Sequence, residues 1–320
     1  MRRLVVSLFL SMAVIAVSCL PAVHPTPPPA GAPAKQVALS GASVMIGVGD
    51  IASCSQSLDE VTARMVDSVL RADSVENVND AVFTLGDNVY DNGTMTDFTK
   101  CFTPSWGDPK KRIMAKIHPT PGNHDYFTPL ANPYYVYFGA RAGDKDKGYY
   151  SYDVGEWHAV AINSEMIVNS GFSAKERLAQ ETWLAQDLKA SAKLCTVVYF
   201  HHPRFSSGYH GSDRKLAPLW QIMYDNNVDL VLSGHDHEYE RFLPQTPAGA
   251  LDTLRGIPEI VAGTGGEELR GFGGLREKNS AMQIEGRAGV LLLTLGSKEF
   301  RSVFLDVGGF IRDPSGGKCH

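Results

Sequence analysis

The stretch AVFTLGDNVY, residues 81–90, decides the fold of this chain, because a continuous apolar run ends there in a glycine and a polar cluster. Four other short runs have the same character, at 44–48, 157–162, 195–200 and 228–232. Continuous apolar runs of this length indicate buried strands. The sequence therefore predicts a sheet whose chemistry-bearing residues gather at the strand ends.

Amphipathic stretches separate these strands. Apolar residues recur at helical spacing in three segments, namely Leu58, Val61, Met65, Val69 and Leu70 in the first, Trp183, Leu184 and Leu188 in the second, and Leu216, Leu219, Trp220 and Met223 in the third. Such stripes are typical of helices with one face on a core. Strands that alternate with helices predict an α/β protein.

The last third of the chain has a different pattern. The runs 257–264, 289–295 and 300–307 follow one another with no helical stripe between them, which predicts antiparallel strands of a second sheet. Residues 92–112 and 127–148 lack strong periodicity, so both segments are predicted to be loops. The first of these loops is long enough to shape a site.

The N-terminus has the pattern of an export signal. Met1, Arg2 and Arg3 give a positive start, and 4–17 is apolar but shorter than the roughly 20 residues that span a bilayer. The stretch before Cys19 resembles a bacterial lipobox, which predicts a lipidated Cys19 and membrane attachment, with ordinary cleavage nearby as the alternative. The chain is thus expected to be exported, as a periplasmic, cell-surface or secreted protein.

The organisation predicted from these patterns is a signal peptide over 1–19, a linker over 20–42 and one catalytic domain over 43–320. The linker is rich in Pro and Ala and is expected to be a semi-extended tether. The formal charge is -5, and it becomes -7 when the two leader arginines are lost (-5 - 2 = -7). An acidic chain of this kind argues against a general nucleic-acid binding surface.

Four cysteines remain after the leader, namely Cys54, Cys101, Cys195 and Cys319. An even number in an exported chain predicts two disulfides, and four cysteines allow three pairings. The favoured pairing joins Cys54, just after the first strand, to Cys101 in the loop after Tyr90. Cys195 and Cys319 would then tie the tail to a core strand.

Polar clusters follow five of the strands, where open α/β sheets place their ligands. They are Gly49-Asp50, Gly86-Asp87-Asn88-Val89-Tyr90, Gly122-Asn123-His124-Asp125, His201-His202-Pro203 and Gly234-His235-Asp236-His237. One such cluster alone is usually a turn. Carboxylate, imidazole and amide groups after five separate strands indicate a metal site.

These clusters resemble the motifs of the calcineurin-like metallophosphoesterases, and within them the purple acid phosphatases, over residues 44–243. The resemblance implies a four-layer αββα sandwich of two mixed β-sheets flanked by helices. Most branches of this superfamily open with Asp-x-His, whereas Asp50 is followed by Ile51 and Ala52. Purple acid phosphatases make the same omission and use the tyrosine of Gly-Asp-x-x-Tyr instead, which is Tyr90 here.

The resemblance also implies two metal ions, Fe(III) with a divalent Fe, Zn or Mn. Asp50, Asp87, Tyr90 and His237 would hold the first ion, and Asp87, Asn123, His201 and His235 the second. His201 is preferred to His202 because the family pattern is His-x-Pro and Pro203 sets the register. Hard anionic donors suit a trivalent ion, and imidazole and amide suit a divalent one.

Two further histidines match the family pattern, His124 and His210, and either would stabilise the phosphoryl group or protonate the leaving group. Asp125 is expected to orient His124, with a backbone-capping role as the alternative. Arg204 is more simply explained as an exposed or structural residue than as a phosphate contact. The glycines of 263–266 are interpreted as a turn that ends a strand, because no Lys-Ser/Thr follows them.

The implied function is hydrolysis of phosphate monoesters of small phosphorylated substrates, with a metal-bound hydroxide as the nucleophile. The main alternative is a phosphodiesterase that acts on nucleotides or phospholipid head groups with the same metals. A binding or scaffold protein with a silent centre is the third possibility. The complete ligand set argues against this third class.

Overall fold

The computed structural model of the chain describes residues 42–72, 79–145 and 147–320. The predicted signal peptide and Cys19 lie outside these residues, as does all of the predicted linker except residue 42. No helix within the described ranges is long and apolar enough to cross a membrane.

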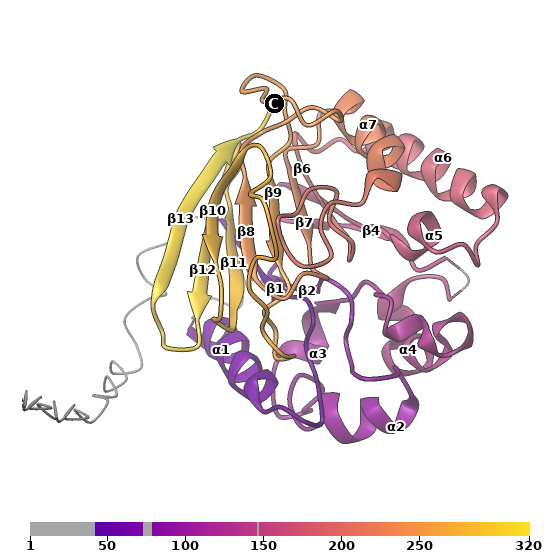
Figure 1. The fold of residues 1–320 in the computed structure, drawn as a ribbon, viewed down its shortest axis with the longest axis vertical. Helices are drawn as coiled ribbons and strands as arrows, with labels where there is room; N and C mark the ends of the chain where they lie inside the picture. The colour runs from indigo at the N-terminus through magenta and orange to yellow at the C-terminus, as the bar shows by residue number, and fades with distance from the viewer. Residues whose placement is uncertain (1–41, 73–78, 146) are drawn as a thin grey trace, which may run out of the picture.

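Two mixed β-sheets lie face to face (Figure 1). The first sheet has the order β13-β12-β11-β1-β2-β3, and its β1, β2 and β3 are parallel while the others are antiparallel. Its strands are β1 (Ser43–Val48), β2 (Ala81–Thr84), β3 (Ile117–His118), β11 (Gly289–Leu295), β12 (Glu299–Asp306) and β13 (Ile311–Lys318).

The second sheet has the order β10-β8-β9-β7-β6-β5-β4. Its central strands β9, β7, β6 and β5 are parallel, and antiparallel strands lie at its two edges. Its strands are β4 (Tyr150–Val154), β5 (Trp157–Ala161), β6 (Cys195–Tyr199), β7 (Leu230–Ser233), β8 (Tyr239–Phe242), β9 (Glu259–Ala262) and β10 (Ser280–Ile284).

Helices cover the outer faces of both sheets, which confirms the four-layer α/β sandwich (Figure 1). α1 packs against β11 of the first sheet, and α5, α6 and α7 lie on the second. The helices are α1 (Leu58–Ala72), α2 (Met95–Asp97), the π-helix Phe98–Phe102, α3 (Ile113–Lys116), α4 (Asn132–Phe138), α5 (Glu165–Val168), α6 (Ala174–Ala190) and α7 (Ala217–Asp225), with short 3-10 segments at Asp125–Phe127, Pro129–Ala131, Gly139–Ala142 and Arg214–Leu216.

The side chains of β6 and of Phe200, which follows it, pack alternately into two hydrophobic clusters, one on each face of the sheet. Val197 and Tyr199 pack in the cluster between the sheets, whereas Val198 and Phe200 pack in the cluster beneath the helices. Successive side chains of a strand point to opposite faces, so a strand covered on both faces is apolar throughout. This is the pattern that the sequence shows at 195–200.

Three predictions of secondary structure need correction, namely the sheet formed by the C-terminal strands and the two loops at 92–112 and 127–148. β11 and β12 are antiparallel as expected, but β11 pairs with β1 in the first sheet, while β9 lies in the second sheet parallel to β7. Residues 92–112 and 127–148 contain short helices, including the π-helix and α4.

The buried face of α1 is also displaced from the predicted stripe. It is centred on Thr62 and Val66, whereas Val61, Met65 and Val69 are only partly buried. Thr62 belongs to the core because its hydroxyl donates to the Gly265 carbonyl at 2.6 Å and accepts from the Trp106 indole at 3.1 Å.

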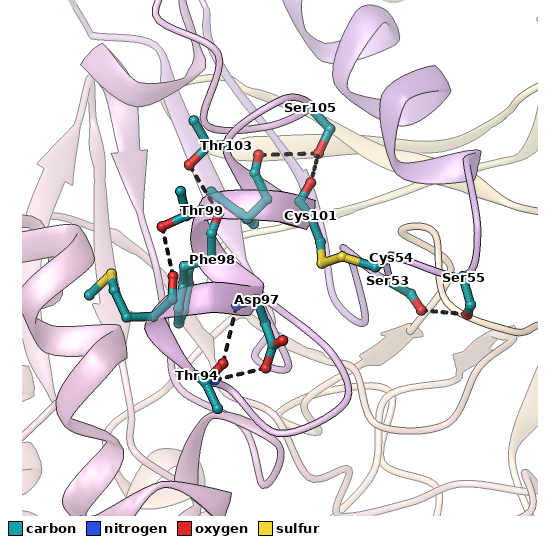
Figure 2. The surroundings of a disulfide bond; sticks show 12 residues. Ser53, Cys54, Ser55, Thr94, Asp97, Phe98, Thr99, Cys101, Thr103 and Ser105 are labelled. Carbon is teal, nitrogen blue, oxygen red and sulfur yellow. Dashed lines mark hydrogen bonds between the residues drawn. A yellow bond between two sulfur atoms is a disulfide. The ribbon is translucent and has the colours of Figure 1, made fainter.

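Two disulfides staple the domain, and both match the favoured pairing. Cys54 is bonded to Cys101, and Cys195 is bonded to Cys319. The first bridge ties the segment after β1 to the π-helix, where the Ser105 hydroxyl donates to the Cys101 carbonyl at 3.2 Å (Figure 2). The second ties the end of the chain to β6. Each disulfide therefore joins segments that the sheets alone do not pair.

We expect the double substitution Cys54→Ser/Cys101→Ser to lower the free energy of unfolding by up to about 4 kcal/mol, because a loop with a sequence separation of 47 is no longer closed in the unfolded chain. Cys54 is exposed and Cys195 is fully buried, so mild reductant is expected to open the first bridge before the second. Urea denaturation with and without reductant measures both effects. Equal denaturation midpoints for the two proteins would contradict a stabilising role.

Candidate metal centre

The seven predicted metal ligands meet where the carboxyl ends of parallel strands from both sheets converge. Each ligand lies just beyond a strand end, in the loop after β1, β2, β3, β6 or β7. They are Asp50, Asp87, Tyr90, Asn123, His201, His235 and His237. The two sheets thus bring together residues that are up to 187 positions apart (237 - 50 = 187).

Sharp backbone turns aim three of these side chains. Asp50, Asp87 and His235 have positive φ angles of 59°, 47° and 71°. Non-glycine residues seldom adopt this left-handed region, because the Cβ atom crowds the backbone. Strain of this kind is stored mostly at functional sites, where the surrounding fold imposes it.

Two glycines allow the ligands to approach the backbone. Gly86 has φ +81°, and a Cβ atom there would lie 2.6 Å from the His201 ring. A Cβ atom on Gly122 would lie 2.3 Å from Asp87 Oδ1. Any side chain at either position would displace a predicted ligand, which explains why a glycine precedes Asp87 and Asn123.

The first group of ligands is centred on the Tyr90 hydroxyl. This oxygen lies 2.7 Å from Asp50 Oδ1, 2.9 Å from Asp87 Oδ2 and 3.3 Å from His237 Nε2. His237 Nδ1 donates to the Glu268 carbonyl at 2.7 Å, which fixes the ring with Nε2 directed at the group.

The second group is centred on His201. Its Nε2 lies 3.1 Å from Asn123 Oδ1, 3.1 Å from His235 Nδ1 and 3.2 Å from Asp87 Oδ2. The other ring nitrogen donates to the Leu85 carbonyl at 2.7 Å and fixes the ring. Asp87 Oδ2 contacts both groups, as a bridging ligand must.

His202 has different surroundings from His201. Its Nδ1 lies 3.0 Å from the Ser164 hydroxyl and its Nε2 lies 3.3 Å from Glu165 Oε1. Although its ring packs 4.4 Å from His235, both of its nitrogens thus have partners of their own. His201, not His202, contacts Asp87 and Asn123.

The electrostatics of the cluster fit a bound cation. Burial, together with the Asp50 and Asp87 carboxylates, raises the pKa of Tyr90 well above its usual range. Burial opposes the charging of His201, yet the adjacent Asp87 raises its pKa to about 10. In the metal-free protein the neutral Tyr90 hydroxyl hydrogen-bonds to the buried carboxylates, and the charged His201 offsets part of their negative charge; bound metal ions would take over both roles. Carboxylate, phenolate, imidazole and amide donors suit such ions.

His124 lies beside the first group. Its ring packs 4.2 Å from the Tyr90 ring, its backbone N–H donates to Asp87 Oδ1 at 2.8 Å, and its Nδ1 donates to the Asp91 carbonyl at 2.6 Å. Asp125 does not hydrogen-bond to His124, and its contacts instead fit the alternative of a carboxylate that caps backbone N–H groups. Asp125 Oδ2 accepts from the Gly122 N–H at 2.9 Å and from the Asn88 side chain at 3.0 Å, so it shapes the loop that carries Asn123.

His210 lies beside the second group. Its ring packs 4.2 Å from the His235 ring, and its backbone N–H donates to Asp236 Oδ1 at 2.7 Å. Its Nε2 accepts from Arg270 Nη1 at 2.7 Å. Sequence reasoning missed Arg270, which lies 60 residues from His210 in a stretch without a motif.

Arg204 and the glycine stretch 263–266 both have structural roles, as expected. Arg204 is buried, donates to the Pro247 carbonyl at 3.0 Å and stacks over the Phe205 ring, so it is not exposed. The glycine stretch 263–266 follows β9 and packs on the loop after β1, where the Gly265 N–H donates to the Gly49 carbonyl at 2.9 Å.

Comparisons with known proteins agree with this geometry. The family model described as calcineurin-like phosphoesterase matches residues 45–239. Purple acid phosphatase 18 of Arabidopsis thaliana is 30% identical over 146 residues, which are 40% of this chain and 32% of that protein. Human acid phosphatase type 7 is 27% identical over 240 residues, 63% of this chain and 51% of that protein. This chain therefore spans about half or less of the length of these relatives.

A solved structure of a purple acid phosphatase, PPD1 from seeds of yellow lupin (Lupinus luteus), has a TM-score of 0.71 and 18% identity, and the match covers 88% of this chain and 54% of the lupin chain. At this identity the match supports the fold alone. The family model covers more than half of the chain and spans all seven predicted ligands, since Asp50 and His237 both lie within 45–239. The chain therefore belongs to the calcineurin-like phosphoesterase family and is similar to its purple acid phosphatases.

Proposed function

We propose that this chain hydrolyses phosphate monoesters of small molecules at a dinuclear metal centre. Asp50, Asp87, Tyr90 and His237 would hold one ion, and Asp87, Asn123, His201 and His235 the other. The observation that carries the proposal is the position of the Tyr90 hydroxyl, within 2.9 Å of both Asp50 and Asp87. This oxygen takes the place of the histidine in Asp-x-His.

The proposed metals are Fe(III) in the tyrosine site and a divalent Fe, Zn or Mn in the other. Phenolate and carboxylate oxygens favour the harder ion, and the imidazole-rich second group favours a divalent one. When bound, such a pair acidifies water and stabilises the charge that develops on the phosphoryl oxygens. The names of the relatives, which include purple acid phosphatases, support phosphatase activity.

The protein's own contribution is to fix the ligands and to supply a proton at the open side. His124 Nδ1 is engaged by the Asp91 carbonyl, so Nε2 is the atom that can exchange a proton with a leaving group. His210 Nε2 accepts from Arg270, so this nitrogen carries no proton in the structure. We therefore assign the proton donor to His124, which would act in its doubly protonated form, because Nδ1 already donates to the Asp91 carbonyl and Nε2 would have to carry the transferred proton.

We also propose export of the protein to an oxidising compartment. The two disulfides support this proposal, because such bonds persist outside the reducing cytosol. Attachment to a membrane through a lipidated Cys19 is the corresponding proposal for the N-terminus. Mass spectrometry of the mature N-terminus from cell envelopes tests it, and an unmodified N-terminus beyond Cys19 would contradict it.

The function is tested by comparing two substrates with metal-loaded protein. We expect kcat/KM for p-nitrophenyl phosphate to exceed that for bis(p-nitrophenyl) phosphate by roughly tenfold or more. The reason is that the monoester has an additional non-bridging oxygen and negative charge, and groups of the site that bind them discriminate between the two substrates. Chelation should abolish both activities, and added metal should restore them. A preference for the diester would favour the phosphodiesterase. Two bound metals without activity on either ester would favour a silent binding protein.

A further inference from the structure

Arg270 lies at the edge of the metal centre, on the loop that follows β9. Its backbone N–H donates to the His237 carbonyl at 3.0 Å, which fixes its position next to a predicted ligand. Its guanidinium lies 2.7 Å from His210 Nε2 and 5.5 Å from the centre of the Tyr209 ring. The His210 ring in turn packs 4.2 Å from His235, so one imidazole separates the guanidinium from the ligand cluster.

The guanidinium has unused capacity to bind an anion. Within residues 42–72, 79–145 and 147–320, no carboxylate lies within ion-pair distance of Arg270, although Glu267 and Glu268 are its near neighbours in the chain. One of its five N–H donors is used by His210. Arg241, by contrast, has two donors bound to Asp313 at 2.6 and 2.9 Å. Arg270 is thus a partly exposed cation without a carboxylate in ion-pair contact, and its remaining donors are available to an anion at the edge of the site.

We propose that Arg270 is a substrate-contacting residue, which binds non-bridging oxygens of the phosphoryl group and selects dianionic monoesters over diesters. This inference rests on the proposed function of the same site. The planar guanidinium presents donors in a fork that matches two phosphate oxygens, and an arginine in such a contact is stronger and more directional than a lysine. His210 and the Tyr209 ring hold the fork at the edge of the cluster.

The selection follows from the oxygens available. A monoester has three non-bridging oxygens and up to two negative charges, whereas a diester has two such oxygens and one charge. If two bound metal ions engaged two of the non-bridging oxygens, a third would be left for Arg270 only in the monoester. Inorganic phosphate has the same surplus oxygen, so it is a probe of this contact that requires no turnover.

The test compares metal-loaded wild type with Arg270→Gln and Arg270→Lys. Arg276→Gln is the matched control, since Arg276 is an exposed arginine of the same loop bonded to Ser280. We expect Arg270→Gln to lower kcat/KM for p-nitrophenyl phosphate and the affinity for inorganic phosphate by about 10- to 100-fold each, the range for a lost hydrogen bond to a charged group. Diester hydrolysis should change by less than about threefold, a small part of that range.

For monoester hydrolysis and phosphate affinity, Arg270→Lys should lie between wild type and Arg270→Gln, because lysine keeps the charge and loses the planar fork of donors. Metal content, measured by mass spectrometry, should be the same in all variants. Calorimetric titration with phosphate measures affinity without catalysis. The titration therefore tests the Arg270 contact even if the wild type proves inactive. An inactive wild type would reject the proposed function but would not reject this contact.

Several results would overturn the inference. Unchanged phosphate affinity in Arg270→Gln, or an equal loss for monoester and diester, would mean that Arg270 does not select the dianion. Loss of metal would assign it a structural role. A positioning role through His210 predicts that Arg270→Gln has no further effect in a His210→Ala background, whereas direct contact predicts that its effect persists there.

Discussion

Replacing Asp87 with Asn is expected to abolish binding of both metals and phosphoesterase activity while preserving the fold. Asp87 Oδ1 accepts from the His124 N–H, a bond that the Asn carbonyl can keep. Oδ2, which contacts Tyr90 and His201, becomes an NH₂ group that cannot bridge two ions. We expect metal affinity to fall by more than the roughly 10- to 100-fold caused by changes around a metal site. The accompanying loss of kcat/KM should be on the order of 10³-fold or more, above the effect of one lost charge-stabilising donor.

The matched control is Asp229→Asn, which changes a buried carboxylate at the opposite end of β7 from His235. Asp229 accepts from the backbone N–H groups of Thr196 and His320, both at 2.7 Å. Its substitution should cost stability and leave the metals in place. Metal content and the rise in melting temperature on metal addition distinguish the two variants. Two metals retained by Asp87→Asn would rule out Asp87 as the bridge.

The strands, and the strand ends at which the candidate ligands gather, could be predicted because both signals are local. A strand such as β2 is a short apolar run, and Gly86 after it leaves room for the His201 ring beside the candidate ligand Asp87. Signals of this kind lie within short sequence motifs. The disulfide pairing was accessible for a related reason, since Cys54 and Cys101 each lie a few residues from a segment with a ligand.

Strand pairing was not accessible, because β9 and β11 are both short apolar runs that fit either sheet. Which sheet receives them depends on contacts between segments hundreds of residues apart, such as the pairing of Ser43 with Leu295. The buried face of α1 was misplaced because Thr62, a polar residue, is satisfied in the core by partners that only the folded chain provides.

The parts of the site that depend on two loops meeting were missed or assigned wrongly. Arg270 belongs to no motif, and its contact with His210 exists only after the loops around 210 and 270 have folded together. Asp125 lies next to His124 in the sequence, yet its carboxylate points to Gly122 and Asn88. Adjacency in the chain therefore did not identify the partner of a side chain.

Tyr90→Phe is expected to remove the colour of the iron-loaded protein. If Tyr90 binds Fe(III) as a phenolate, charge transfer from the ring to the metal gives a visible band and a pink to purple protein. The substitution removes the oxygen that contacts Asp50, Asp87 and His237 and keeps the ring that packs on His124. The band should disappear, and Fe(III) affinity should fall by at least roughly tenfold. Visible spectra and iron content of mildly oxidised protein measure both.

Tyr134→Phe provides the control, because Tyr134 is also fully buried and its hydroxyl donates to the Pro119 carbonyl at 3.0 Å, away from the ligand cluster. This variant should keep its colour and its iron. A wild type that binds iron fully and stays colourless would mean that Tyr90 is not a ligand. The carboxylates and histidines would then hold the metals without the phenolate, and the similarity to purple acid phosphatases would no longer extend to their iron chemistry. Retained colour in Tyr90→Phe would instead require another phenolate, and Tyr90 would then serve only to hold Asp50 and Asp87 in place.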